Sequence, residues 1–112
     1  MSLRKIATLL TLVLGASAAP AQAPVAAPAF DRPIEAGSWG GIVRNGPGMS
    51  YARITSLREG ERVSLLYNTG VVWNDYPWFL IRLSDGRLGF QWGGILCHRA
   101  VRVAGVYQRC TR

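Results

Sequence analysis

Beyond position 33, apolar residues come in short runs, and each run is closed by residues that favour turns. Asn-Gly-Pro-Gly at 45–48 ends one run, Asn-Thr-Gly at 68–70 ends another, and Ser-Asp-Gly-Arg at 84–87 ends a third. No stretch in this region sustains the helical spacing of about 3.6 residues. Short runs separated by such turns are typical of all-β proteins. The pattern therefore predicts an all-β domain over 34–112.

Five or six short strands are expected in this domain. The short apolar runs and the turns between them place the strands at 39–44, 51–54, 62–67, 78–83, 88–92 and 100–108. Asp85 and Gly86 supply the positive φ that a tight hairpin turn needs. Residues 93–96 are typical of a single helical turn. Several short strands with tight turns favour a small β-barrel over a sandwich.

Residues 1–18 are organised like a secretory signal peptide. Arg4 and Lys5 give a positive start, and residues 6–14 are uncharged and mostly aliphatic. A small-x-small pattern, as signal peptidase requires, follows at 16–18. The apolar stretch is far shorter than the ~20 residues that span a bilayer, which argues against a membrane anchor. We expect cleavage after Ala18, giving a periplasmic or secreted chain with no stable membrane insertion.

Residues 19–33 form a stretch rich in alanine and proline. Proline at this density opposes helix and sheet and favours an extended polyproline II chain. We interpret the stretch as a flexible or semi-rigid linker, with a proline-rich ligand motif as the alternative. The sequence thus divides into a signal peptide (1–18), a linker (19–33) and one small domain (34–112).

The chain is strongly basic, with 13 lysine and arginine residues against 6 acidic ones and a net charge of +7. A small basic chain first suggests a nucleic-acid-binding protein. Cleavage after Ala18 removes two basic residues and leaves 11 against 6, a net charge of +5. Export makes acidic groups of the cell envelope better partners for this charge, so we expect no nucleic-acid partner.

Cys97 and Cys110 are the two cysteines of the chain. In a small exported protein, two cysteines predict one disulfide. The bridge would close a loop of about 14 residues and contribute roughly 3 kcal/mol in the chain-entropy model. The alternative is a catalytic Cys97 with His98 as its base. It is disfavoured because neighbouring residues on a strand point to opposite faces.

Four motifs occur in the order found in a known family. Residues 43–51 resemble the pattern V-R-x-G-P-G-x-x-Y, and 56–63 resemble x-L-x-x-G-x-x-V. Residues 78–82 resemble W-Y-K-V-R, and 85–90 resemble D-G-R-x-G-W. On these motifs, the chain resembles the bacterial Src-homology-3-like (SH3b) family over about 39–96. The resemblance implies a small SH3-like β-barrel, here with an extra C-terminal strand, that serves as a binding module.

Aromatic residues give such a module a candidate binding surface. In the expected strand 78–83, alternation places Phe79 and Ile81 on the core face and turns Trp78 outward. In the SH3 family, an outward tryptophan at this place lines a ligand groove together with aromatics of the first loop and the last turn. By resemblance, the groove residues are Tyr51, Trp78 and Trp92, flanked by Trp73 and Tyr76.

Two functions fit this surface. Aromatic side chains beside arginines suit peptide stems, sugar faces and carboxylates. Export and the resemblance together predict a non-enzymatic module that binds peptidoglycan, or its peptide stems, in the cell wall. The alternative is a protein–protein interaction module, such as an inhibitor or accessory subunit of an exported cell-wall enzyme. The long apolar segment 68–77 suggests that alternative, and it departs from the SH3b pattern. Gln91 and the tail from Cys97 onward are two further departures from that pattern.

Catalytic machinery is not expected. His98 is the single histidine, too few for a histidine-rich metal site. Glu59 and Glu61 share a face of an extended segment, but they lie in a polar turn where raised pKa values, as acid–base catalysis needs, are not expected. We therefore assign no catalytic residue, no metal ligand and no cofactor.

Overall fold

The computed structural model describes residues 29–111, so the predicted signal peptide and most of the predicted linker lie outside the described residues. A short 3₁₀ turn, η2 (Gly93–Ile95), is the helical turn expected at 93–96. The strands, in chain order, are β1 (Ile34–Ser38), β2 (Gly41–Arg44), β3 (Arg53–Leu57), β4 (Glu61–Trp73), β5 (Tyr76–Leu83), β6 (Leu88–Trp92), β7 (Leu96–His98) and β8 (Gln108–Arg109).

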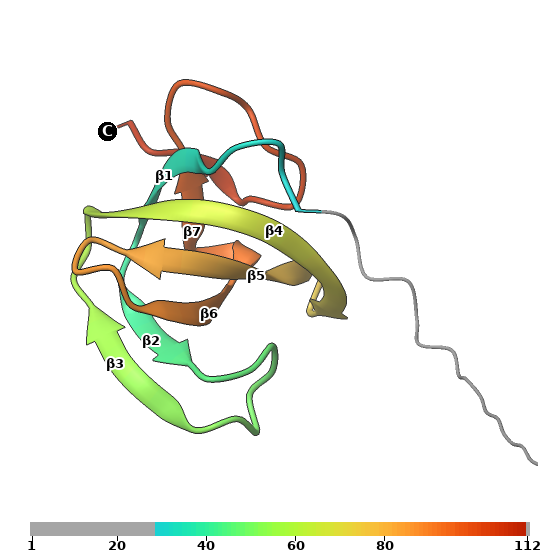
Figure 1. Cartoon of the computed structure of the whole chain (residues 1–112). Coiled ribbons are helices and arrows are strands. Elements are labelled where there is room, and N and C mark those ends of the chain that lie inside the picture. Colours follow the sequence, from blue (N-terminus) through green and yellow to red (C-terminus); the bar gives the residue numbers. More distant parts are fainter. Residues whose placement is uncertain (1–28, 112) are drawn as a thin grey trace, which may run out of the picture.

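All eight strands belong to one curved sheet, in the spatial order β3-β2-β6-β5-β4-β1-β7-β8 (Figure 1). Neighbouring strands are antiparallel except β7 and β8, which are parallel. Within residues 29–111 the sheet is open, with β3 and β8 as its edges. The predicted all-β class is confirmed. The expected count of five or six strands is too low, because β1 and the C-terminal residues join the same sheet.

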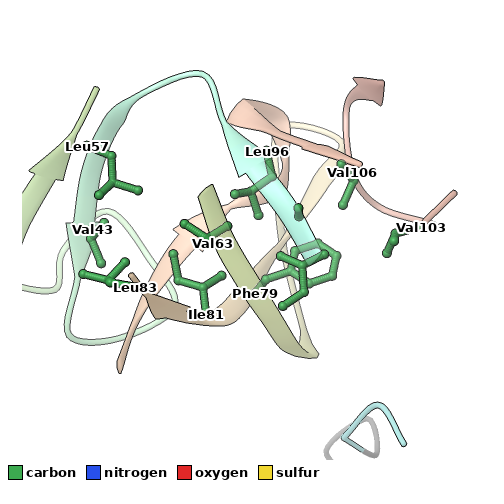
Figure 2. Close-up of a cluster of buried hydrophobic side chains, with 11 residues drawn as sticks. Val43, Leu57, Val63, Phe79, Ile81, Leu83, Leu96, Val103 and Val106 are labelled. Carbon is green, nitrogen blue, oxygen red and sulfur yellow. The ribbon is translucent and has the colours of Figure 1, made fainter. Parts of the chain in front are cut away.

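One cluster of apolar side chains forms the core on the inner side of the curved sheet. Figure 2 shows it running from Val43 and Leu57 at one end to Val103 and Val106 at the other. Phe79 and Ile81 are fully buried in it, as alternation along β5 predicts. Phe30 precedes the first strand and stacks on Phe79, with ring centroids 6.5 Å apart.

The β4–β5 hairpin is longer than the sequence predicts. We expected a strand to end at 68–70, but β4 continues to Trp73 and β5 already begins at Tyr76. The turn residues act as a bulge: Gly70 has φ of +79°, and the pairing register shifts between Asn68 and Val72. Thr69 Oγ1 donates a hydrogen bond of 2.7 Å to the carbonyl of Trp78, which keeps the two strands together across the bulge.

The expected strands at 39–44 and 100–108 are both wrong in extent. Gly40 and Gly41 have φ of +109° and +98°, so the chain turns sharply there and only Gly41–Arg44 is strand. Residues 100–107 form turns because Val103 and Val106 both point into the core, three residues apart, and Gly105 has φ of +91°. The extra C-terminal strand is therefore the two-residue β8.

The predicted disulfide between Cys97 and Cys110 is confirmed, with an S–S distance of 2.02 Å. It fastens the end of the chain to β7, and the amide of Cys110 also donates a 2.9 Å hydrogen bond to the carbonyl of His98. Figure 1 shows the C-terminal residues looping over the end of the sheet beside β1 and β7. Both sulfurs lie close to Gly37 of β1, where a side chain would meet them at about 3 Å.

Candidate binding groove

A groove with a volume of about 280 Å³ opens on the face of the sheet opposite the core cluster. It lies between the β2–β3 loop and the end of the β4–β5 hairpin, which Figure 1 shows on the same side of the molecule. Its lining is mostly apolar. The residues that line this aromatic groove are Gly41, Ile42, Arg44, Met49, Trp73, Trp78, Trp92 and Ile95.

Trp92 is the residue that organises the groove. Its Nε1 donates hydrogen bonds to the carbonyls of Trp73, at 2.7 Å, and of Tyr76, at 3.1 Å. Its ring also meets those of Trp73 and Tyr76 edge to face, at centroid distances of 5.0 and 5.6 Å. Asn74 and Asp75, both with positive φ, form the hairpin turn between them. Trp92 on β6 therefore fixes the end of the β4–β5 hairpin against the sheet.

Trp78 lies on the side of β5 that the sequence predicts, away from Phe79 and Ile81, and it lines the groove. It is far less exposed than an outward-pointing residue, however, at 2% against 45% for Trp73. Trp78 thus forms the base of the groove and Trp73 part of its rim. The indole Nε1 of Trp78 is buried and has no hydrogen-bond partner within the described residues.

Tyr51 and Tyr76 support the groove without lining it. The ring of Tyr51 covers Gly46, where any side chain would collide with it. Arg44 Nη1 donates a 2.9 Å hydrogen bond to the carbonyl of Tyr51, which holds the loop that carries Met49. The glycine–proline motif at 45–48 is therefore a device for close packing of a loop.

The ring of Tyr76 lies between those of Trp92 and Tyr107, 5.6 and 6.0 Å from them. It buttresses Trp92 from the side of the C-terminal segment. Of the five predicted groove residues, the structure thus brings together Trp73, Trp78 and Trp92 in the lining, while the two tyrosines lie behind them.

Sequence reasoning missed four side chains of the groove. Ile42 and Arg44 flank the buried Val43, so strand alternation carried a signal for their shared outward face. Met49 and Ile95 lie in a loop and in η2, where no periodicity reports the direction of a side chain. Among the residues that the structure describes, Arg44 is the one charged residue that lines the groove.

The structure gives a physical reason for the polar side chain of Gln91. It is fully buried and donates through Nε2 to the carbonyls of Gly40 and Ile42, at 3.2 and 3.4 Å. Its Oε1 accepts a 2.9 Å hydrogen bond from Ser38 Oγ, which in turn accepts one from the amide of Gly40. An apolar side chain at position 91 would leave these groups short of partners. Gln91 therefore ties β2, and with it one wall of the groove, to β6.

Cys97, His98 and Glu61, which the sequence offered as possible catalytic residues, have structural roles or are buried. Cys97 is oxidised, and His98 beside it is buried, at 9% exposure. Glu61 accepts a 2.8 Å hydrogen bond from the amide of Arg58, as a turn residue does. Within residues 29–111, no three His, Cys, Asp or Glu side chains are grouped as metal ligands would be.

Comparison with known proteins adds no relative: neither protein-family models, nor curated proteins, nor solved structures gave a match to this chain. The part of the chain that the structure describes includes no helix long and apolar enough to cross a membrane.

Proposed function

We propose that this chain is an exported, non-enzymatic binding module of the SH3b type that recognises peptidoglycan, or its peptide stems, through the aromatic groove. The observation that carries the proposal is the convergence of Trp73, Trp78 and Trp92 on one apolar groove beside Arg44. The ordered SH3b-like motifs and the secretory signal at 1–18 support it. A periplasmic or extracellular site of action follows from that signal.

The groove offers chemistry suited to a short peptide stem. Indole faces bind methyl groups and the faces of small side chains without requiring charge. Arg44 stands at the groove with a guanidinium able to meet a carboxylate. Its Nη1 donates a hydrogen bond to the carbonyl of Tyr51. A guanidinium has five N–H donors, so Arg44 can bind a ligand carboxylate as well. A ligand that fits both features has small apolar groups to contact the groove and a free carboxylate to pair with Arg44. A short peptide with a free acid has both.

Binding of the exported form (residues 19–112) to purified sacculi tests the proposal. Trp73→Ala removes an exposed indole from the rim, while the Trp73 carbonyl that Trp92 binds is retained. We expect about a tenfold loss of sacculus binding, as for a central aromatic anchor. Leu88→Ala is the matched control, because Leu88 is 51% exposed and lies outside the groove. Equal binding by wild type and Trp73→Ala would refute the role of the groove.

Arg44→Lys separates charge from geometry at the same site. Lysine keeps the positive charge but lacks the planar fork that binds a carboxylate through two hydrogen bonds. Isolated stem peptides with a free or an amidated terminal acid give the comparison. The wild type should prefer the free acid, and Arg44→Lys should lose most of that preference. A wild type that binds both peptides equally would exclude carboxylate recognition at Arg44.

A second candidate function rests on the end of the β4–β5 hairpin. Val71, Val72 and Trp73 are 45%, 63% and 45% exposed, an apolar tip suited to a protein partner. An inhibitor or accessory subunit of an exported cell-wall enzyme would use this tip. Val72 does not line the groove, so Val72→Ser should weaken the capture of such an enzyme while sacculus binding is unchanged. The reverse result would favour the groove alone.

A further inference from the structure

The charge of the chain is concentrated in its last part. Residues 19–85 have six arginines and six acidic residues and are therefore neutral overall. Beyond position 85 there are five arginines, one histidine and no acidic residue. The whole net charge of +5 in the exported form thus resides after Asp85.

Three of these arginines gather in the C-terminal segment 99–109, which we call the basic segment. Arg99, His98 and Arg109 line a recess of about 320 Å³. Arg102, His98 and Arg109 line a second recess of about 550 Å³. The two recesses share His98 and Arg109, so the arginines surround adjoining hollows. Arg102 and Arg109 are exposed and Arg99 is half-buried.

The basic segment also exposes two apolar side chains among its arginines. Val101 is 58% exposed between Arg99 and Arg102, and Tyr107 is 51% exposed two residues before Arg109. A polyanion dissolved in water gains nothing from an exposed valine. A bilayer surface does, because apolar side chains enter the acyl boundary while arginines meet phosphates, and tyrosine favours the interface between them.

The backbone of the basic segment is held in place, so these side chains are presented without folding on contact. Val103 and Val106 anchor it in the core, at 7% and 8% exposure. The disulfide fastens its end to β7, and the amide of Tyr107 donates a 3.1 Å hydrogen bond to the carbonyl of Gly93. Little conformational entropy is then lost on binding.

From these observations we infer that the basic segment docks on the surface of a bilayer containing anionic phospholipids, with Arg99, Arg102 and Arg109 at the phosphates and Val101 at the acyl boundary. The site is separate from the aromatic groove and independent of the proposed function. Its attraction is electrostatic, about one to a few times thermal energy per arginine, and weakens with salt.

Co-sedimentation of the exported form with vesicles tests the inference. The vesicles are an equal mixture of phosphatidylglycerol and phosphatidylcholine, with pure phosphatidylcholine as the neutral reference. We expect binding to the mixed vesicles, loss of binding in high salt, and none to the neutral vesicles. Arg99→Gln/Arg102→Gln/Arg109→Gln should lower the affinity at least about tenfold.

The matched control is Arg32→Gln/Arg53→Gln/Arg58→Gln, which removes the same charge outside the basic segment. Equal loss in both triple variants would overturn the inference, because binding would then follow net charge alone. Val101→Ser should reduce vesicle binding severalfold while all charges remain. If Val101→Ser has no effect and a soluble acidic glycan competes fully with the vesicles, the surface is a polyanion site and the bilayer assignment is wrong. Trp73→Ala, which tests the groove, should bind vesicles like the wild type.

Discussion

The aromatic groove and the basic segment are built in opposite ways from the same small core. The groove lies largely on strands and is fixed by side-chain hydrogen bonds, as from Trp92 and Gln91. The basic segment consists largely of turns, and a disulfide and two buried valines hold it. Regular strands thus present an apolar surface of defined shape, whereas the turns present charge. Because both regions pack on one small core, we expect them to unfold together.

Phe79→Ala should have the largest effect, since Phe79 is fully buried in the core cluster. Removing a buried phenyl ring costs about 3–5 kcal/mol in the free energy of unfolding. The ring contacts Phe30 and approaches Gly105 of the basic segment, and its strand β5 also carries Trp78 of the groove, so we expect both regions to be destabilised together. Urea unfolding, followed by tryptophan fluorescence and by amide exchange in the basic segment, should show one shared transition. Two separate transitions would show that the regions are independent.

The disulfide separates the two regions more selectively. Cys97→Ser/Cys110→Ser should lower the free energy of unfolding by roughly 3 kcal/mol, because the unfolded chain gains conformational entropy when the bridge is absent. Amide protection should fall first around Cys110, while the Trp73–Trp92 contact at 5.0 Å persists in the folded fraction. Near-ultraviolet circular dichroism reports that contact. Loss of the tryptophan signal before global unfolding would mean that the groove depends on the disulfide.

Gln91→Leu tests the groove side of the comparison. It removes the hydrogen bonds to Ser38, Gly40 and Ile42 at similar side-chain volume. A buried hydrogen-bonding group left without its partner costs about 1–3 kcal/mol. We expect a loss of about 2 kcal/mol, with faster amide exchange in β2 and none of that change in the basic segment. A stability equal to that of the wild type would show that Gln91 does not secure β2.

The sequence predicted best where one local rule decides the structure. The strand 88–92 was placed at its observed bounds, and the disulfide was predicted from two cysteines in a chain that we expect to be exported. Alternation located the core face of β5 and the groove side of Trp78, because each depends only on neighbouring positions.

The remainder depends on contacts between distant segments. The hydrogen bond from Thr69 to the carbonyl of Trp78 carries β4 through residues that ordinarily end a strand. Residues 100–107 contain several β-formers, but burial of both Val103 and Val106 requires turns. The exposure of Trp78 depends on the rim around it, and a local pattern contains no information about that rim.

Asp85 should show the smallest effect, at the exposed β5–β6 turn that belongs to neither region. The backbone amide of Arg87 donates to its Oδ1 at 3.0 Å, and the Arg87 guanidinium donates to its Oδ2 at 2.8 Å. The backbone hydrogen bond and then the guanidinium lower the pKa of Asp85 below its ordinary value. The stabilisation is therefore present at neutral pH and disappears as the pH falls through this lowered pKa.

Arg87→Gln separates the two causes. It removes the guanidinium but keeps the backbone amide, so the pKa of Asp85 should rise only part of the way towards its ordinary value. Carboxyl NMR titration measures that change, and the stability at neutral pH should barely alter because the ion pair is fully exposed to solvent. A complete return to the ordinary value would assign the shift to the ion pair, and the turn amide would then have no part in it. Vesicle binding should be unaffected, since the charge of Arg87 is already paired with Asp85 and lies outside the basic segment.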